Sequence, residues 1–450
     1  MISIFLIIES RPSMTILMPP INFSPTKRTF YLKSLPKRKQ EKQFLRFFSP
    51  VSADARLGSV PQSPPFDPCR RSAAFVQLSI TSRFDRVTSI WNRANPQLRD
   101  LAVYEPGKPI EETARELNVA PRDIIKLASN ENPLGPSPRA IAAMRAAIGS
   151  AQLYPDSGGF YLRDALAQKL GFARENIILG NGSNEVIEFL GHAFLNPGDD
   201  IVTPAHAFIA YKLIAHLFGA RTIEVATPDF QVDLDAVPAV ITAKTKIVFI
   251  ANPNNPTGSL IGQEKIDNFL TRVPDEIITV LDEAYFEFLD DPPDTLRHVR
   301  NGRNVVILRT FSKIHGLASL RVGYGIARPE LIEVLQKTRQ PFNVNGVAQA
   351  GALAALGDDE HLRKTKRVVD SGRAYLENEF RAMKLKFIPS AGNFVFVNGG
   401  DGPTVFKKML ARKIIVRPLR GYNLPEWIRI TVGTMEQNEK CIAVLKEVLS

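Results

Sequence analysis

Short apolar runs alternate with helical stretches through most of this chain, and this alternation limits the folds that the chain can adopt. From Ile124 onward the runs are rich in Val and Ile, and several are separated by ten or more residues with helical spacing. The runs are 177–179, 201–202, 246–250, 277–281, 305–308 and 322–326. Strands that alternate with helices form a largely parallel sheet covered by helices. We therefore predict an α/β fold for this region.

The C-terminal third has a different pattern. After Pro329 a long helical stretch extends to about residue 385, and we expect one break in it near Gly357. Apolar runs at 394–397, 413–416 and 427–432 then indicate a smaller α+β domain. A chain of 450 residues is also too long for one ordinary core, so two domains are expected.

The net charge of +11 is concentrated at the N-terminus. Residues 1–100 hold 16 Lys and Arg against 6 Asp and Glu, whereas the rest of the chain holds 41 against 40. The predicted folded body is nearly neutral, so its charge does not indicate a nucleic acid partner. No apolar run approaches the length of a membrane span. The two cysteines, Cys69 and Cys441, indicate neither a disulfide framework nor a metal site.

Residues 1–85 form a basic extension ahead of the predicted fold. This segment is rich in Ser, Pro, Arg and Lys and poor in acidic residues, and its apolar start at residues 1–8 is a poor secretory signal. An organelle transit peptide, a disordered tail and wrongly included upstream sequence all have this composition. We expect a cytoplasmic protein, or one in a plastid or other organelle if the extension is a transit peptide.

Lys313 follows the apolar run at 305–308, at the end of a predicted strand. A lysine placed there can form a Schiff base with an aldehyde cofactor. Thr310, Ser312 and Arg321 are close to it in the sequence and are the donor types that bind a phosphate ester. An aldehyde anchor beside a phosphate anchor is what pyridoxal phosphate requires.

Three further motifs supply groups that suit the same cofactor. Gly180-Asn-Gly-Ser183 lies between a strand and a helix, where free backbone N–H groups favour a phosphate. Asn252-Pro-Asn-Asn-Pro-Thr-Gly258 follows the run at 246–250, and the amide of Asn255 is a suitable partner for a phenolate oxygen. Asp282-Glu-Ala-Tyr285 follows the run at 277–281, so Asp282 can face a crevice at the strand ends and keep a pyridine nitrogen protonated.

The order of these motifs, with Ser312-Lys313 and Arg321 last, resembles the aspartate-aminotransferase family of fold type I enzymes. The segments 127–137, 153–156 and 429–434 are similar to those of the histidinol-phosphate aminotransferase family. The resemblance covers about residues 90–450. It implies a large domain with a mostly parallel seven-stranded sheet sandwiched by helices, and a smaller α+β domain. The implied division is 86–135 for an arm and part of the small domain, 136–345 for the large domain and 346–450 for the C-terminal small domain.

The resemblance also implies how the site binds its cofactor. Lys313 would bond to pyridoxal phosphate and later move a proton, Asp282 would pair with the pyridinium nitrogen, and Phe208 would stack on the ring. Many relatives have tyrosine at the position of Phe208, so a hydroxyl is lost there. Asn255 and Tyr285 would hold the phenolic oxygen. The phosphate would be bound by Ser183, Asn184, Thr310, Ser312, Arg321 and, from a neighbouring subunit of a homodimer, Tyr154.

For the substrate, Arg429 matches the arginine that binds the substrate anion, and Arg417, Asn130 and the partner's Tyr104 complete that pocket. The implied reaction converts L-histidinol phosphate and 2-oxoglutarate to imidazole-acetol phosphate and L-glutamate in two stages. No metal is implied. The alternatives are an aromatic amino acid aminotransferase and, more distantly, a threonine-phosphate decarboxylase. This fold also serves as the effector domain of transcription regulators, but residues 1–90 lack the helical periodicity of a DNA-reading module.

Overall fold

The computed structural model describes residues 90–101, 103 and 107–450. The basic extension of residues 1–85 and the arm residue Tyr104 lie outside the described residues. Within the described part, none of the helices combines the length and apolar character that crossing a membrane requires.

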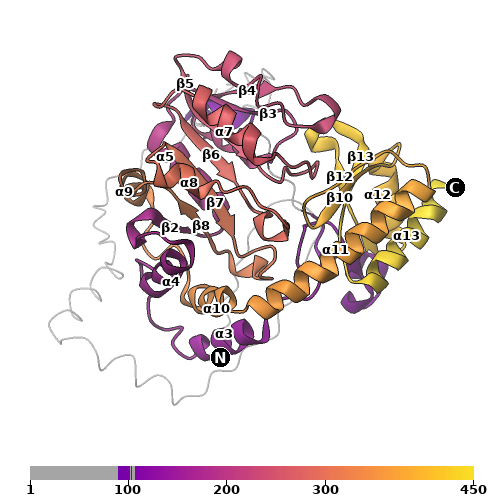
Figure 1. Cartoon of the computed structure of the whole chain (residues 1–450). Coiled ribbons are helices and arrows are strands. Elements are labelled where there is room, and N and C mark those ends of the chain that lie inside the picture. Colours follow the sequence, from indigo (N-terminus) through magenta and orange to yellow (C-terminus); the bar gives the residue numbers. More distant parts are fainter. Residues whose placement is uncertain (1–89, 102, 104–106) are drawn as a thin grey trace, which may run out of the picture. The chain divides into compact units, whose positions relative to one another are not determined.

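A seven-stranded sheet forms the centre of the large domain, in the order β2-β8-β7-β6-β5-β3-β4 (Figure 1). Its strands are β2 (Ile177–Gly180), β3 (Asp200–Pro204), β4 (Arg221–Val225), β5 (Thr245–Ala251), β6 (Ile278–Asp282), β7 (Val305–Thr310) and β8 (Gly323–Ile326). The pairs that join β4, β3, β5, β6 and β7 are parallel, whereas β8 is antiparallel to both of its neighbours. The predicted largely parallel sheet is therefore confirmed.

Helices cover both faces of this sheet, as the residues of β5 illustrate. Ile247 and Phe249 join a core cluster with α5 (Ser183–Phe194), α6 (Ala210–Leu217) and α9 (Pro329–Thr338). Val248 and Ile250 belong to a second cluster on the other face, with residues of α3 (Pro138–Ile148), α4 (Phe160–Leu170), α7 (Gln263–Arg272), α8 (Leu296–Arg300) and α10 (Gly346–Leu356). Successive residues of a strand point to opposite faces, so this apolar run supplies both cores.

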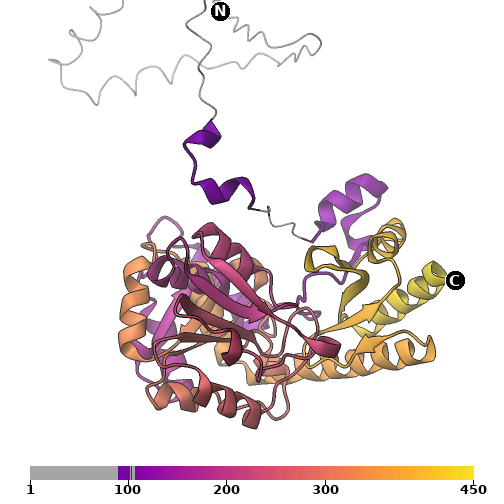
Figure 2. The same cartoon turned by 90° about the horizontal axis from the view of Figure 1, so that it is seen from above.

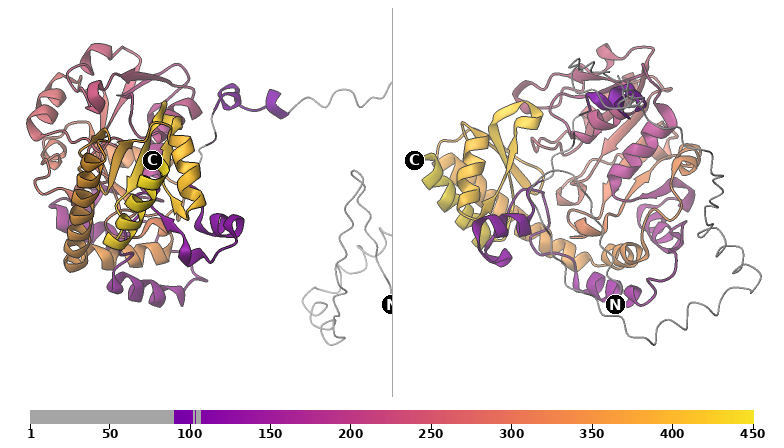
Figure 3. Two further views of the ribbon diagram at one scale, coloured as in Figure 1. Left: turned by 90° about the vertical axis from the view of Figure 1, so that its right-hand side faces the viewer. Right: turned by 180° about the vertical axis from the view of Figure 1, so that it is seen from behind.

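The smaller domain contains the antiparallel sheet β12-β13-β10-β9, seen beside the large domain in Figure 2. Its strands are β9 (Phe387–Ile388), β10 (Phe394–Asn398), β12 (Arg417–Leu419) and β13 (Leu424–Thr431). A short parallel pair joins β1 (Ile125–Lys126) to β11 (Ile414–Ile415), so residues before and after the large domain meet here. The helices are α2 (Ile110–Leu117), α11 (Asp359–Ala382), α12 (Gly402–Ala411) and α13 (Met435–Leu449), and Figure 3 shows α11 alongside α13.

The helical stretch after Pro329 has two breaks instead of the single break that we predicted. The break near Gly357 is confirmed, because α10 ends at Leu356 and α11 begins at Asp359. A second interruption separates α9 from α10 at residues 339–345. Pro341 lies in this segment and disfavours helical conformation in the residue before it. Asn345 then starts α10, since its side chain accepts a hydrogen bond from the backbone N–H of Ala348.

Nine short 3-10 helices complete the regular structure of the described residues. They are η3 (Ile90–Asn92), η4 (Pro96–Arg99), η5 (Pro121–Asp123), η6 (Arg174–Asn176), η7 (Pro228–Phe230), η8 (Pro238–Val240), η9 (Phe286–Phe288), η10 (Ala318–Leu320) and η11 (Arg420–Tyr422).

Candidate active site

The carboxyl edge of the central sheet gathers the polar residues that the sequence singles out. Asp282 ends β6 and Thr310 ends β7, and the two strands are adjacent and parallel. Because β8 runs antiparallel to β7, the chain turns back at this edge without a crossover to the other end. The turn carries Lys313 and Arg321, so both remain beside the ends of β6 and β7. Ligands of open α/β sheets bind at this edge.

Lys313 faces a cavity of about 140 Å³ at the strand ends. Its Nζ donates a hydrogen bond to the backbone carbonyl of Ser129, at 3.1 Å. Burial, together with the nearby cations of Arg429 and Arg321, lowers the pKa of Lys313 to about 7. A large fraction of this amine is therefore neutral near pH 7, and the neutral form is the nucleophile.

Asp282 is buried in the wall of the same cavity, with 6% of its surface exposed. The hydroxyl of Tyr211 donates to its Oδ2 at 2.7 Å, and the backbone N–H of Ala284 donates to its Oδ1 at 3.2 Å. Burial raises the pKa of Asp282 to about 6, while both hydrogen bonds oppose the rise by stabilising the anion. Tyr211 was not singled out from the sequence, because nothing in its local pattern links it to Asp282.

Asn255 and Tyr285 lie together and are each held by a partner. Arg429 Nη1 donates to Asn255 Oδ1, which turns the amide NH₂ of Asn255 away from the guanidinium. The side chain of Asn130 donates to the hydroxyl oxygen of Tyr285 at 2.8 Å. The proton of that hydroxyl therefore remains available to another acceptor. Burial raises the pKa of Tyr285 to about 12, so the phenol is protonated near neutral pH.

Hydrogen-bond donors for an anion converge at the start of α5. Helix α5 begins at Ser183 after Gly182, and its first turn has no side-chain cap. Gly182 has a φ of +82°, and a Cβ on it would lie 2.2 Å from Arg321 Nη2, so only glycine permits this close approach. Arg321 Nη1 also donates to Ser312 Oγ, at 3.2 Å. Ser183, Asn184, Thr310, Ser312 and Arg321 line one cavity with Lys313 and Asp282.

A second cavity of about 160 Å³ adjoins the first and shares four of its lining residues. Those residues are Phe208, Asn255, Tyr285 and Lys313. Arg417 and Arg429 line the second cavity, as does Asn130. Arg429 is 7% exposed, and its Nη2 donates to the carbonyl of Ala128 at 2.8 Å. The amine of Lys313 thus lies between a phosphate-type site and a pair of arginines.

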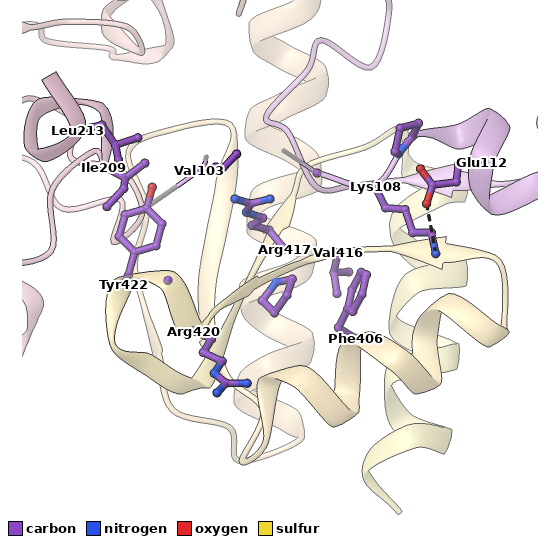
Figure 4. A pocket seen from close by; sticks show the side chains of 14 residues that line it. Val103, Lys108, Glu112, Ile209, Leu213, Phe406, Val416, Arg417, Arg420 and Tyr422 are labelled. Carbon is purple, nitrogen blue, oxygen red and sulfur yellow. Dashed lines mark ion pairs between the residues drawn. The ribbon is translucent and has the colours of Figure 1, made fainter. Parts of the chain in front are cut away.

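A wider groove of about 950 Å³ adjoins the second cavity (Figure 4). Gly107, Arg417 and Tyr422 line both spaces, so the groove gives access to the arginine pair. The α6 side contributes Ile209 and Leu213, and Lys108 pairs with Glu112 at the opposite side. The charged residues of the groove therefore lie mainly on the small-domain side.

Among the sequence-predicted residues that the structure describes, Tyr154 lies away from these cavities. Tyr154 is 83% exposed and stacks on Phe342, with ring centroids 4.7 Å apart. Tyr104 lies outside the described residues. The described residues also contain no cluster of three or more His, Cys, Asp or Glu side chains arranged to bind a metal ion.

Comparison with known proteins identifies the family. The family model for aminotransferase class I and II matches residues 122–445. This chain belongs to the class I and II aminotransferase family. A histidinol-phosphate aminotransferase of Akkermansia muciniphila is 53% identical over 362 residues, which cover 80% of this chain and all of that protein. A histidinol-phosphate aminotransferase of Moorella thermoacetica is 48% identical over 351 residues, covering 77% of this chain and 90% of that protein.

A solved structure supports the same placement within the aminotransferase family. The histidinol-phosphate aminotransferase of Sinorhizobium meliloti, crystallised in complex with pyridoxal-5'-phosphate, has a TM-score of 0.73 and 28% identity. The match covers 80% of this chain and 98% of that chain. The family and the fold predicted from the motifs are therefore confirmed. Tyr211 lies outside every motif singled out from the sequence. Ser129 and Thr431 lie within the segments 127–137 and 429–434, but their contacts were not predicted: the carbonyl of Ser129 accepts from Lys313, and Thr431 Oγ1 accepts from the backbone N–H of Asn130 at 2.9 Å.

Proposed function

We propose that this aminotransferase uses pyridoxal phosphate to transfer the amino group of L-histidinol phosphate to 2-oxoglutarate. The products are imidazole-acetol phosphate and L-glutamate. The observation that carries this proposal is the position of the Lys313 amine between the cluster at Arg321 and the pair Arg417 and Arg429. The cluster at Arg321 suits the phosphate of a cofactor, and the arginine pair suits the anion of a substrate. The relatives named histidinol-phosphate aminotransferase support the choice of substrate.

The residues of the first cavity fit pyridoxal phosphate. The space that glycine leaves at position 182 lets Arg321 approach the uncapped start of α5, which suits the phosphate. At the other end the buried Asp282 suits the pyridine nitrogen, and Asn255 and Tyr285 would hold the phenolic oxygen. Phe208 would stack on the ring. When bound, the cofactor supplies an aldehyde that takes up the amino group and a ring that withdraws electrons from the substrate.

Lys313 has two tasks in this proposal. Its amine, which the lowered pKa leaves largely neutral near pH 7, would hold the cofactor through its aldehyde in the resting enzyme. As a free base during turnover, Nζ would accept a proton from the substrate Cα and then give it up again. A base whose pKa lies close to the working pH is effective in both directions of this transfer.

The arginine pair explains how one pocket accepts two different substrates. Glutamate has a carboxylate and histidinol phosphate has a phosphate ester, and the planar guanidinium fork binds both groups. Asn255 and the carbonyl of Ala128 hold Arg429 in place, so its orientation is fixed before a substrate arrives. We propose that Arg417 adds the second positive charge that a phosphate requires, and that Asn130 acts through Tyr285.

We further propose that the enzyme works as a homodimer. Tyr154 lies on a surface with several other exposed large apolar side chains, which favours contact with a second copy. Phe342 stacks on Tyr154, and the exposed Leu153, Phe160 and Tyr161 are close to it in the sequence. In the dimer Tyr154 would reach the phosphate in the partner's site, and Tyr104 would reach the partner's substrate pocket.

A substrate panel on the purified enzyme tests the proposed function. With 2-oxoglutarate as acceptor, kcat/KM is measured for histidinol phosphate, phenylalanine and tyrosine, and O-phosphothreonine is assayed for release of CO₂. We expect histidinol phosphate to be the best substrate. A higher kcat/KM for phenylalanine would support the aromatic aminotransferase instead, and CO₂ release from O-phosphothreonine would support the decarboxylase.

A further inference from the structure

Tyr211 combines complete burial with a direct contact to the carboxylate of the proposed cofactor site. It lies in α6, its side chain has 0% exposure, and it lines the 140 Å³ cavity with Asp282 and Lys313. Its hydroxyl donates to Asp282 Oδ2 at 2.7 Å. The two residues are 71 positions apart in the sequence, so this contact exists only because α6 packs against the sheet.

Two aromatic rings hold the Tyr211 phenol in this orientation. Its ring stacks on Phe249 of β5, with centroids 4.7 Å apart and planes 7° apart. It also meets Phe208 edge-on, with centroids 5.7 Å apart and planes 88° apart. Both arrangements are favourable geometries for aromatic pairs. Because the ring cannot swing away, the hydroxyl remains directed at Asp282.

The Asp282 carboxylate can accept further hydrogen bonds besides the two that it already accepts. An ionised carboxylate has about four acceptor positions, and Tyr211 and the N–H of Ala284 occupy two of them. Burial favours the neutral acid, as does the neighbouring carboxylate of Glu283, whereas the cation of Lys313 and the Tyr211 hydroxyl favour the anion. Burial also raises the pKa of Tyr211 itself, so the phenol keeps the proton that it donates.

We propose that Tyr211 is a positioning residue that keeps Asp282 ionised and aimed at the pyridine nitrogen of the cofactor. The inference rests on the proposed function, since it concerns pyridoxal phosphate in the same site. One proton lies between the ring nitrogen and Asp282. In this arrangement it stays on the nitrogen, and the total number of protons does not change. Without the hydroxyl, the proton moves toward the Asp282 carboxylate, and the ring becomes a weaker electron acceptor.

The ring nitrogen itself can report this change. Wild-type protein and the variant Tyr211→Phe are reconstituted with pyridoxal phosphate labelled with ¹⁵N in the ring, and the ¹⁵N chemical shift is measured by NMR. We expect a protonated nitrogen in the wild type and a shift toward the neutral pyridine value in Tyr211→Phe. The matched control is Tyr324→Phe, which removes a buried phenol hydroxyl whose partner is Arg309. This control should leave the ¹⁵N shift unchanged.

A second measurement separates positioning from a general packing role. Affinities are compared for pyridoxal phosphate and for 1-deazapyridoxal phosphate, in which C–H replaces the ring nitrogen. We expect Tyr211→Phe to weaken pyridoxal phosphate binding roughly tenfold or more, the scale of one hydrogen bond to a charged group. Binding of the deaza analogue should be unaffected, because it offers Asp282 no N–H.

Equal weakening for both ligands, or an unchanged ¹⁵N shift in Tyr211→Phe, would overturn the inference. Failure of wild-type protein to bind pyridoxal phosphate would instead overturn the proposed function. The two failures are thus distinguishable.

Discussion

Arg417 lies directly opposite Arg429 across the antiparallel strands β12 and β13. Like charges at facing positions of a sheet repel each other. Both residues line the same 160 Å³ cavity, so an anion bound there would be attracted by both and would offset their repulsion. The register of one small sheet thereby creates a site that favours a doubly charged group.

The first prediction follows from this pair. Arg417→Ala should lower kcat/KM for histidinol phosphate about ten- to a hundredfold more than for phenylalanine, since one charge-assisted contact contributes about 1.5–3 kcal/mol. Arg429→Ala serves as the comparison and should impair both substrates, because both present an anion to it. Equal losses for the two substrates in Arg417→Ala would show that Arg417 does not select phosphate.

The second prediction concerns the reactivity of Lys313. Its pKa is lowered to about 7 by burial and nearby cations, so the neutral amine becomes the major form above that pH. In cofactor-stripped protein, the rate at which pyridoxal phosphate forms its covalent adduct should rise through pH 7 and level off above it. Stopped-flow absorbance measures this rate. An increase that continues to pH 10 would indicate an ordinary lysine, and Lys313→Ala should form no adduct and catalyse no transamination.

The third prediction addresses the phosphate end of the site. Gly182→Ala would place a Cβ 2.2 Å from Arg321 Nη2, so Arg321 must move and cofactor affinity should fall about tenfold or more. Gly198→Ala is the control, because Gly198 has a similar φ of +92° but open space around its Cβ position. Both variants place a side chain at a positive φ, which costs about 1–3 kcal/mol, but only the first should release pyridoxal phosphate on dialysis. Similar affinity in the two variants would argue against Arg321 as a phosphate ligand.

The fourth prediction tests a buried ion pair beneath the site. Arg309 Nη2 lies 2.8 Å from Glu283 Oε2, and the two side chains are 6% and 3% exposed. Arg309→Ala leaves the Glu283 carboxylate buried without its partner and should reduce the free energy of unfolding by about 3–5 kcal/mol in urea titrations. The double variant Arg309→Met with Glu283→Leu should lose less of this free energy, because the Glu283 carboxylate is no longer buried without its ion-pair partner. A double variant less stable than Arg309→Ala would contradict this explanation.

The fifth prediction concerns the proposed dimer. Tyr154→Ala and Lys313→Ala should each lower the activity of the homodimer that carries it. A mixed dimer of the two variants should regain activity at one of its two sites. That site combines the intact Lys313 of one chain with the intact Tyr154 of the other. The measurement is activity after the two variants are mixed, unfolded and refolded together. If Tyr154 acts within its own chain, mixing will restore nothing.

The sequence alone determined the family, the largely parallel sheet and the residues at its carboxyl edge. The reason is local: Asp282, Thr310 and Lys313 lie at or just beyond the ends of apolar runs, and adjacent parallel strands end at the same edge. Gly182 and Ser183 were also predicted to mark a helix start, because their motif follows an apolar run and precedes a helical pattern. The break at 339–345 was missed, although Pro341 was visible there, because helical spacing on both sides outweighed one proline.

Only the tertiary structure decided which distant side chains hold these residues in place. Tyr211 reaches Asp282 because α6 packs its ring against Phe249, and no spacing in the chain encodes that contact. The position of Arg417 opposite Arg429 likewise depends on the register of two strands joined by the irregular segment at η11. Periodicity specifies which face of an element is buried, whereas packing and register specify what that face touches.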